Sequence, residues 1–101
     1  MTLDTVLQVT PDRFEGLHCE LRTTLDTENV HSEHDISVGD GQQFHGILQQ
    51  CLETWKAQGV RGVWVKVPRS LLETTEFIQS LLRNGFELHH AQKDYVSTIV
   101  P

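Results

Sequence analysis

The segment from Arg61 to Phe86 constrains the fold more than any other part of the chain. It opens with valines that alternate with other residues, Gly62-Val63-Trp64-Val65-Lys66-Val67-Pro68. β-Branched residues at period two predict a half-buried strand, and the proline ends it because proline has no amide to give to the ladder. Ser70 and Glu73 have the spacing of a capping box, which predicts a helix of about four turns that Gly85 closes. A strand from Phe86 would complete a βαβ-like unit.

A second alternation begins at Gly16. Three apolar residues of this segment alternate with three polar ones: Leu17, Cys19 and Leu21 with His18, Glu20 and Arg22. This pattern predicts a strand with one apolar face. Residues 1–11 show no clean period, and we expect an edge strand or an ordered tail there, ahead of a single domain over residues 12–101. Residues 23–41 are too polar and too long for a tight connection, which predicts a surface loop or a short strand around Ile36 to Val38.

An apolar stripe marks the first long helix, which we expect from Gly41 to Gln58. Its members recur at intervals of three and four residues: Phe44, Ile47, Leu48, Cys51, Leu52 and Trp55. Asp40 suits the N-cap, and Gly59 suits the position just past the C-terminus. Residues 86–90 and 95–100, joined by a short turn, predict a β-hairpin. The predicted fold class is α+β with α/β-like layers, in which two helices cover a mixed sheet.

Composition and charge exclude several classes of partner. The chain has 101 residues, a length that allows one domain. Its net charge of −6 opposes binding to nucleic acid or to an anionic membrane. No apolar run reaches the length of a membrane span, and Met1 to Thr10 lacks the features of a secretory signal. We therefore expect an intracellular protein, with the cytoplasm favoured over the mitochondrion or nucleus. Cys19 and Cys51 lack a CxxC spacing, so we expect buried free thiols.

The common catalytic and metal-binding motifs are absent from the sequence, and we expect no catalytic residue. There is no glycine-rich phosphate loop, GxSxG elbow, HExxH pattern or paired-cysteine zinc pattern. The segment from His31 to Asp35 contains four possible metal ligands. A polar loop offers no surrounding side chains to hold these ligands in position, so we expect no metal site. His89 and His90 are adjacent on a predicted strand and should point to opposite faces, so they could not grip one ion together.

Basic and aromatic residues supply the candidate binding residues. Arg61, Lys66 and Arg69 surround one predicted strand end, where they could receive an anionic ligand or balance carboxylates. His89 and His90 complete this candidate ligand-binding set. Trp64 shares a strand face with Lys66. We expect it in the core, because a central strand covered on both faces needs apolar residues on both, and the alternative is an exposed aromatic at a partner interface.

The C-terminal segment predicts self-association. Residues 95–100 are apolar and uncharged, and we expect them to end the sheet, where an edge strand is a template for pairing with another chain. A twofold homodimer is the commonest such arrangement. The candidate interface residues are Trp64, Tyr95, Val96 and Ile99. The acidic net charge and Pro101 oppose the pairing.

Residues spread along the chain resemble a known family. Gly62 to Pro68, Asn84-Gly85-Phe86, His89-His90-Ala91, Tyr95 and Ile99-Val100-Pro101 resemble the domain that precedes the catalytic domain in certain Nudix hydrolases. Those hydrolases include plant ADP-ribose and NADH pyrophosphatases and the animal nucleoside diphosphate-linked moiety X motif 6 protein. Asp12-Arg13-Phe14-Glu15-Gly16 and the helix around Trp55 fit the same pattern. The resemblance therefore covers about residues 12 to 101.

The resemblance implies a fold similar to half of an N-acetyltransferase, of the acyl-CoA N-acyltransferase type. It also implies a non-catalytic domain that acts in dimerisation, in ligand or partner binding, or in regulation of an attached or partner Nudix catalytic domain. The glutamate-rich signature that holds Mg²⁺ is absent here, so we expect Mg²⁺ only in the attached domain and no cofactor in this chain. An acetyltransferase-like enzyme that binds acyl-CoA or a nucleotide is the alternative. Against it, Gln58 to Gly62 precedes a strand and so lacks a helix N-terminus for a phosphate.

Overall fold

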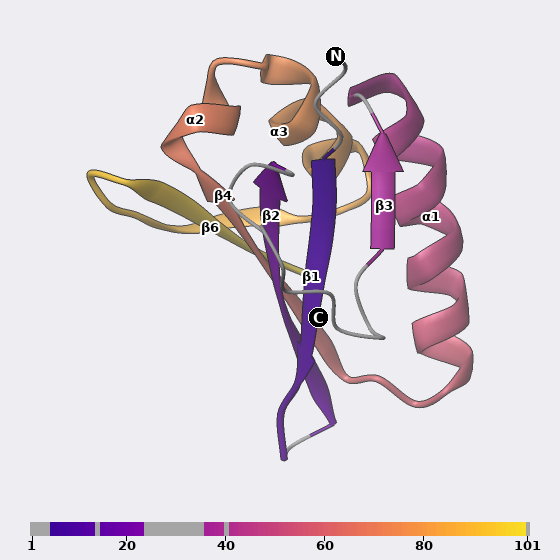
Figure 1. Ribbon diagram of the computed structural model, residues 1–101. Helices are drawn as coiled ribbons and strands as arrows, with labels where there is room; N and C mark the ends of the chain where they lie inside the picture. The colour runs from indigo at the N-terminus through magenta and orange to yellow at the C-terminus, as the bar shows by residue number, and fades with distance from the viewer. Residues whose placement is uncertain (1–4, 14, 24–35, 40, 101) are drawn as a thin grey trace.

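The computed structural model describes residues 5–13, 15–23, 36–39 and 41–100. Within these ranges, six strands form one mixed sheet in the order β3-β1-β2-β4-β6-β5, and three helices pack on it (Figure 1). The strands are β1 (Thr5–Pro11), β2 (Gly16–Thr23), β3 (Ile36–Gly39), β4 (Gly62–Pro68), β5 (Glu87–Ala91) and β6 (Tyr95–Val100). The helices are α1 (Gly41–Ala57), α2 (Arg69–Leu72) and α3 (Thr75–Arg83). This arrangement confirms the predicted α+β class.

The core lies between the helices and one face of the sheet. β4 occupies the middle, parallel to β2 and antiparallel to β6. Its three valines are buried, and the helices bring apolar side chains against them: Phe44, Leu48, Phe77 and Leu81. The rings of Phe44 and Phe77 lie 5.4 Å apart at a tilt of 53°, which is a favourable aromatic geometry. The alternation of β4 therefore sends its valines to the helices and Trp64 and Lys66 to the other side.

The N-terminal strand lies inside the sheet. β1 pairs with β2 on one side and with β3 on the other. The expectation of an edge strand or a tail is therefore wrong for residues 5–11. The physical reason is β3, which the sequence offered only as an alternative and which covers the outer side of β1. Leu7 and Val9 belong to the buried core.

The C-terminal hairpin is confirmed, but its edge strand is the other one. β6 lies between β4 and β5, so the expectation that residues 95–100 end the sheet is wrong. Val96, for example, lies between Val67 and Ala91 in register. β4 and β5 are both antiparallel to β6 and hence parallel to each other, so the predicted βαβ-like unit is split by β6. On this side of the sheet the outer strand is β5, whose residues are all exposed.

The predicted second helix is two helices, α2 and α3. Ser70 lies inside α2, whose N-cap is Pro68 without a side-chain hydrogen bond, so the predicted capping box is wrong. The break has a packing reason: Leu71 and Phe77 are six residues apart, which would place them on different sides of a continuous helix. With the break, both are buried. Gly85 has a φ of +89° and follows the helix end as predicted.

The first helix is confirmed to within one residue of its predicted C-terminus. α1 ends at Ala57 and Gly59 adopts a φ of +87°, the left-handed conformation expected just past a helix. The predicted N-cap Asp40 and the His31 to Asp35 segment lie outside the described residues. None of the helices in the described ranges is long and apolar enough to cross a membrane.

Candidate binding site on the open sheet face

The sheet face opposite the helices, which we call the open face, carries polar and aromatic side chains. Residues that pair in register project to the same face of a sheet, and two rows can be followed across its strands. One row contains Thr10, His18, Trp64, Ile99 and Glu87. The next contains Gln8, Glu20, Lys66, Ser97 and His90. The first row is aromatic at its centre, and the second is rich in hydrogen-bonding groups.

Trp64 lies half-buried on the open face. The expectation that a covered core encloses it is wrong, because the described helices pack on the other face. Its indole leans over Gly16 and Gly62, which are neighbours in register. A Cβ added at Gly16 would lie 2.8 Å from Trp64 Cζ3, and one at Gly62 would lie 3.2 Å from the same ring. The two glycines therefore leave the space in which the indole sits.

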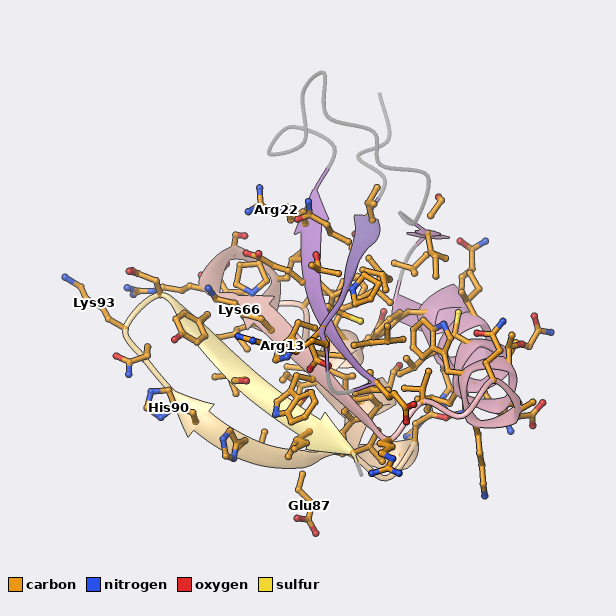
Figure 2. All side chains as sticks on the ribbon, turned by 90° about the horizontal axis from the view of Figure 1, so that it is seen from below. Arg13, Arg22, Lys66, Glu87, His90 and Lys93 are labelled. Carbon is orange, nitrogen blue, oxygen red and sulfur yellow. The ribbon has the colours of Figure 1, made fainter. Side chains whose placement is uncertain are left out.

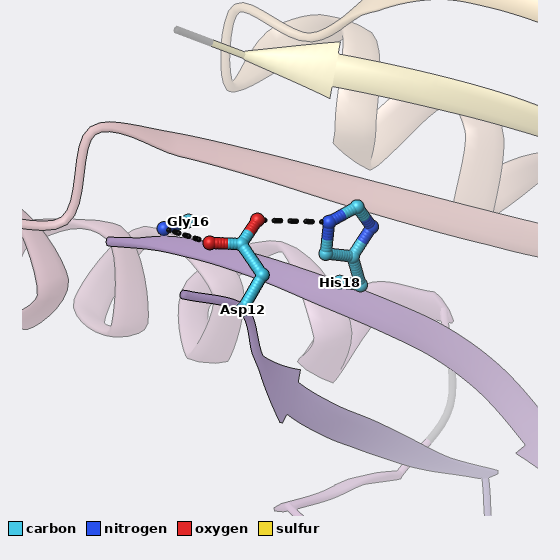
Figure 3. A network of polar contacts seen from close by, with 3 residues as sticks. All are labelled: Asp12, Gly16 and His18. Atoms are coloured by element: carbon cyan, nitrogen blue, oxygen red, sulfur yellow. Dashed lines mark hydrogen bonds and ion pairs between the residues drawn. The ribbon is translucent and has the colours of Figure 1, made fainter. Parts of the chain in front are cut away.

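His18 is the neighbour of Trp64 in this row, and their two rings stack. Its imidazole is parallel to the Trp64 indole, with ring centroids 4.7 Å apart and an interplanar angle of 6°. Asp12 holds the imidazole from the β1–β2 connection: Oδ2 lies 3.0 Å from His18 Nε2, and Oδ1 accepts a hydrogen bond of 2.8 Å from the Gly16 amide (Figure 3). One carboxylate thus ties the turn to the ring that stacks on Trp64.

Lys66 and Tyr95 contact each other on the part of the open face next to the His18–Trp64 stack. The Lys66 Nζ lies 4.0 Å from the centroid of the Tyr95 ring, a cation–π arrangement. Beside them, Arg22 Nη2 lies 3.4 Å from Glu20 Oε2. The Glu20 carboxylate therefore has its own cationic partner, and Lys66 is held by an uncharged ring.

A pocket of about 510 Å³ opens between these groups; we call it the open-face pocket. The charged, aromatic and hydrogen-bonding side chains that line it include His18, Glu20, Trp64, Lys66, His89, His90, Tyr95 and Ser97. Both adjacent histidines line it, so the expectation that they point to opposite faces is wrong. The reason is a register shift of β5 between Leu88 and His90, since a bulge interrupts the alternation of side chains. His90 also contacts the Gln92 side-chain amide.

The structure brings together only part of the candidate ligand-binding set. Lys66, His89 and His90 meet at the open-face pocket. Arg61 and Arg69 flank opposite ends of β4, so the expectation of three charges around one strand end is wrong. Arg61 Nε pairs with Glu15 Oε2 at 3.2 Å, between two largely exposed side chains. Figure 2 shows Lys66 over the sheet, His90 on the hairpin and Lys93 near the tip of the hairpin.

The candidate interface residues also divide between the two faces. Trp64 and Tyr95 line the open-face pocket, and Ile99 is the register partner of Trp64. Val96 pairs with Val67 on the helix side. Sequence reasoning missed Asp12 and His18 as parts of the site. The available signal was the polar half of the alternation in β2, with a glycine two residues before the histidine.

The two cysteines are free thiols, as predicted; Cys19 is buried as expected, whereas Cys51 is half-buried. Burial, with a smaller contribution from the nearby Cys51, raises the pKa of Cys19 to about 12. Burial also raises the pKa of Cys51. Both thiols are therefore held protonated near neutral pH. Among the residues that the structure describes, no three His, Cys, Asp or Glu side chains gather as a metal site would require.

Comparison with known proteins gives one consistent family. The family model described as "Nudix hydrolase domain" matches residues 7–99. Nudix hydrolase 5 of Arabidopsis thaliana is 33% identical over 84% of the chain and 23% of its own length. Nudix hydrolase 10 is 28% identical over 93% of the chain and 28% of its length, and Nudix hydrolase 2 is 38% identical over 59% of the chain and 20% of its length. The chain thus spans about a quarter of these relatives.

Proposed function

Since the chain belongs to the Nudix hydrolase family, we propose that it is a non-catalytic domain on the N-terminal side of a Nudix catalytic domain. In this role it binds a ligand or the catalytic domain and so regulates hydrolysis. One observation carries the proposal: the family match covers residues 7–99, yet the sequence has no Arg-Glu followed by adjacent glutamates. The Mg²⁺ of the reaction would then belong to the glutamates of the catalytic domain.

The share of the relatives that the chain spans supports the same proposal. It spans 23% of Nudix hydrolase 5 and 28% of Nudix hydrolase 10, which leaves most of each relative for a catalytic domain. The open face adds a surface through which an accessory domain can act. Trp64 and Lys66 lie there without a covering helix among the described residues. Neither side chain is needed in the core, so both are available for recognition.

The test is an exchange of the matched segment in a relative. We would replace the segment of Nudix hydrolase 5 that aligns with this chain by the chain itself, and assay ADP-ribose and NADH with Mg²⁺. The chimera should hydrolyse a substrate, and the chain alone should not. Glutamine at the glutamates of the chimera's Nudix signature should abolish its turnover. Turnover by the chain alone, lost on substitution of one of its own residues, would overturn the proposal.

We also propose that this chain forms a homodimer. The exposed β5 offers unpaired backbone groups at the sheet edge, and a twofold pairing of β5 with its own copy would satisfy them. Its bulge and the exposed Glu87 restrain such pairing. Sedimentation equilibrium at micromolar concentration should give a dimer mass. A monomer mass throughout a tenfold concentration range would remove the dimer from the proposal.

The acetyltransferase-like architecture stays a prediction, and acyl transfer has no support from the family match or the relatives. A thermal-shift measurement with acetylpantetheine, which carries the acyl group without the nucleotide of acetyl-CoA, separates the two functions. The Nudix proposal expects no shift. A ligand present at 100 times its dissociation constant should raise the free energy of unfolding by roughly 2.7 kcal/mol, so bound acetylpantetheine would be evident.

A further inference from the structure

We propose that the open-face pocket binds a small organic phosphate that carries a planar ring, with the phosphate at Lys66 and the ring beside Trp64. The site is a property of this chain and does not require an attached catalytic domain. Its ligand class follows from three features of the pocket. These are the sign of its uncompensated charge, the order of its side chains along the sheet, and its size.

The charge of the pocket favours an anion. Lys66 is its permanent cation, and no carboxylate in the described part of the chain lies within ion-pair distance of Nζ. The carboxylate that lines the pocket, Glu20, pairs with Arg22 at 3.4 Å. Lys66 is therefore the charged side chain of the pocket that has no ion-pair partner among the described residues, on a chain whose net charge is −6. A desolvated charge pair with an anion is the complement of such a site.

The donors stand in one row across three adjacent strands. Lys66 on β4 is opposite Ser97 on β6, and Ser97 is opposite His90 on β5. On its other side Lys66 is opposite Glu20 on β2, whose carboxylate pairs with Arg22. An ammonium, a hydroxyl and an imidazole thus lie side by side. His89 joins them because of the bulge. A carboxylate has two oxygens, whereas a terminal phosphate offers three, so a phosphate matches this number of donors better.

The aromatic row lies one step away along the same strands. Trp64 is two residues from Lys66, a separation of about 7 Å in a strand. A ring placed at this row would lie about 7 Å from a phosphate at the donor row, the spacing of a mononucleotide. The geometry thus favours a ring and a phosphate joined by a short linker.

The walls of the pocket are fixed before any ligand arrives. Asp12 holds His18, His18 stacks on Trp64, and the indole fills the space over two glycines. Tyr95 holds Lys66. Fixed side chains lose little conformational entropy on binding, which favours affinity. The volume of about 510 Å³ lies in the range of small-molecule sites.

The two tryptophans make the test direct. Trp64 lies in the pocket and Trp55 on α1, outside it. We would titrate ¹⁵N-labelled protein with adenosine 5′-monophosphate and follow both indole N–H signals, assigned with Trp55→Phe. The Trp64 signal should shift and saturate while the Trp55 signal stays in place. Adenosine and ribose 5-phosphate, each with one half of the ligand, should bind at least about tenfold more weakly.

A matched pair of charge variants separates a site from general attraction. Lys66→Gln and Arg69→Gln remove the same charge, but only Lys66 lines the pocket. Lys66→Gln should weaken binding about tenfold or more, and Arg69→Gln should leave it within about twofold. Equal weakening by both variants would overturn the proposal. So would a Trp64 signal that does not move at millimolar nucleotide, or ribose 5-phosphate that binds as tightly as the nucleotide.

Discussion

The two faces of β4 differ more than any other two surfaces of the molecule. Val63, Val65 and Val67 are at most 4% exposed beneath the helices. Trp64 and Lys66, between them in sequence, are half-buried on a face that no described helix covers. On the covered face the side chains belong to the apolar core cluster, whereas on the open face they contact an imidazole, a phenol ring and two glycines.

This difference indicates that one face of β4 serves stability and the other is available for recognition. Burial of apolar area on the covered face stabilises the fold, because each core side chain contributes about 1.5–3 kcal/mol when it leaves water. The open face contributes less to folding, since its groups keep part of their solvent contact. Truncation of side chains on the covered face should therefore change mainly stability, and loss of the Lys66 charge on the open face should change mainly binding.

The largest expected effect is truncation of the covered core. Phe44 is fully buried against Phe77, so Phe44→Ala should lower the free energy of unfolding by about 3–5 kcal/mol. Trp55→Ala on the same helix should cost less, because Trp55 is only partly buried at the margin of the core. Urea denaturation of the three proteins measures both. An unchanged midpoint for Phe44→Ala would contradict the packing of α1 on the sheet.

A matched pair of glycines tests the packing of the open face. A Cβ at Gly16 would lie 2.7 Å from Asp12 Oδ2 and 2.8 Å from Trp64 Cζ3, so Gly16→Ala should destabilise the protein by about 1–3 kcal/mol. Gly46 lies in α1 with no atom within 4 Å of such a Cβ. Gly46→Ala should stabilise by about 0.5–1 kcal/mol through helix propensity. Thermal unfolding that moves in the same direction for both variants would refute the indole position.

Alkaline pH should weaken the covered face through Cys19. Its pKa rises from 9.0 to about 12 on folding, so above pH 9 the unfolded chain releases a proton that the folded chain retains. This contribution to stability is complete below pH 9 and is lost as pH rises toward 12, with a slope of at most about 1.4 kcal/mol per pH unit. The difference in unfolding free energy between the parent and Cys19→Ala should shrink over this range. A constant difference would argue against burial of the thiol.

The smallest expected effect concerns a polar side chain that is fully buried. Thr98 is fully buried, and its hydroxyl donates a hydrogen bond of 3.0 Å to the Val65 carbonyl. Thr98→Val keeps the shape and removes this bond, which should cost about 0.5–1.5 kcal/mol. Chemical denaturation measures the loss. Stabilisation by Thr98→Val would mean that the bond contributes nothing to pairing of β4 with β6.

The sequence predicted the elements whose signals are local. The alternation around Val65, the stripe of α1 and the C-terminal hairpin all follow from spacing within one segment. The errors arose where distant strands meet. β1 became internal only because β3 pairs with it, and β6 became internal only because β5 folds outside it. No pattern within either strand encodes its neighbours.

The candidate site was predicted in part for the same reason. Lys66 and the two histidines were named from their chemistry, but the bulge that brings His89 and His90 to one pocket depends on the pairing of β5 with β6. The stack of His18 on Trp64 depends on the parallel register of β2 and β4. The sequence contains the side chains of the pocket, while the pairing of strands decides which of them meet.

The most direct test of the difference between the two faces is the affinity for adenosine 5′-monophosphate of two variants at neighbouring positions of β4. Val65→Ala acts on the covered face and should retain the parent affinity within about twofold, although it unfolds at lower urea concentration. Lys66→Gln acts on the open face and should lose affinity about tenfold or more while its urea midpoint stays close to the parent value. Loss of affinity in both variants, or in neither, would contradict the separation of folding from binding on this sheet.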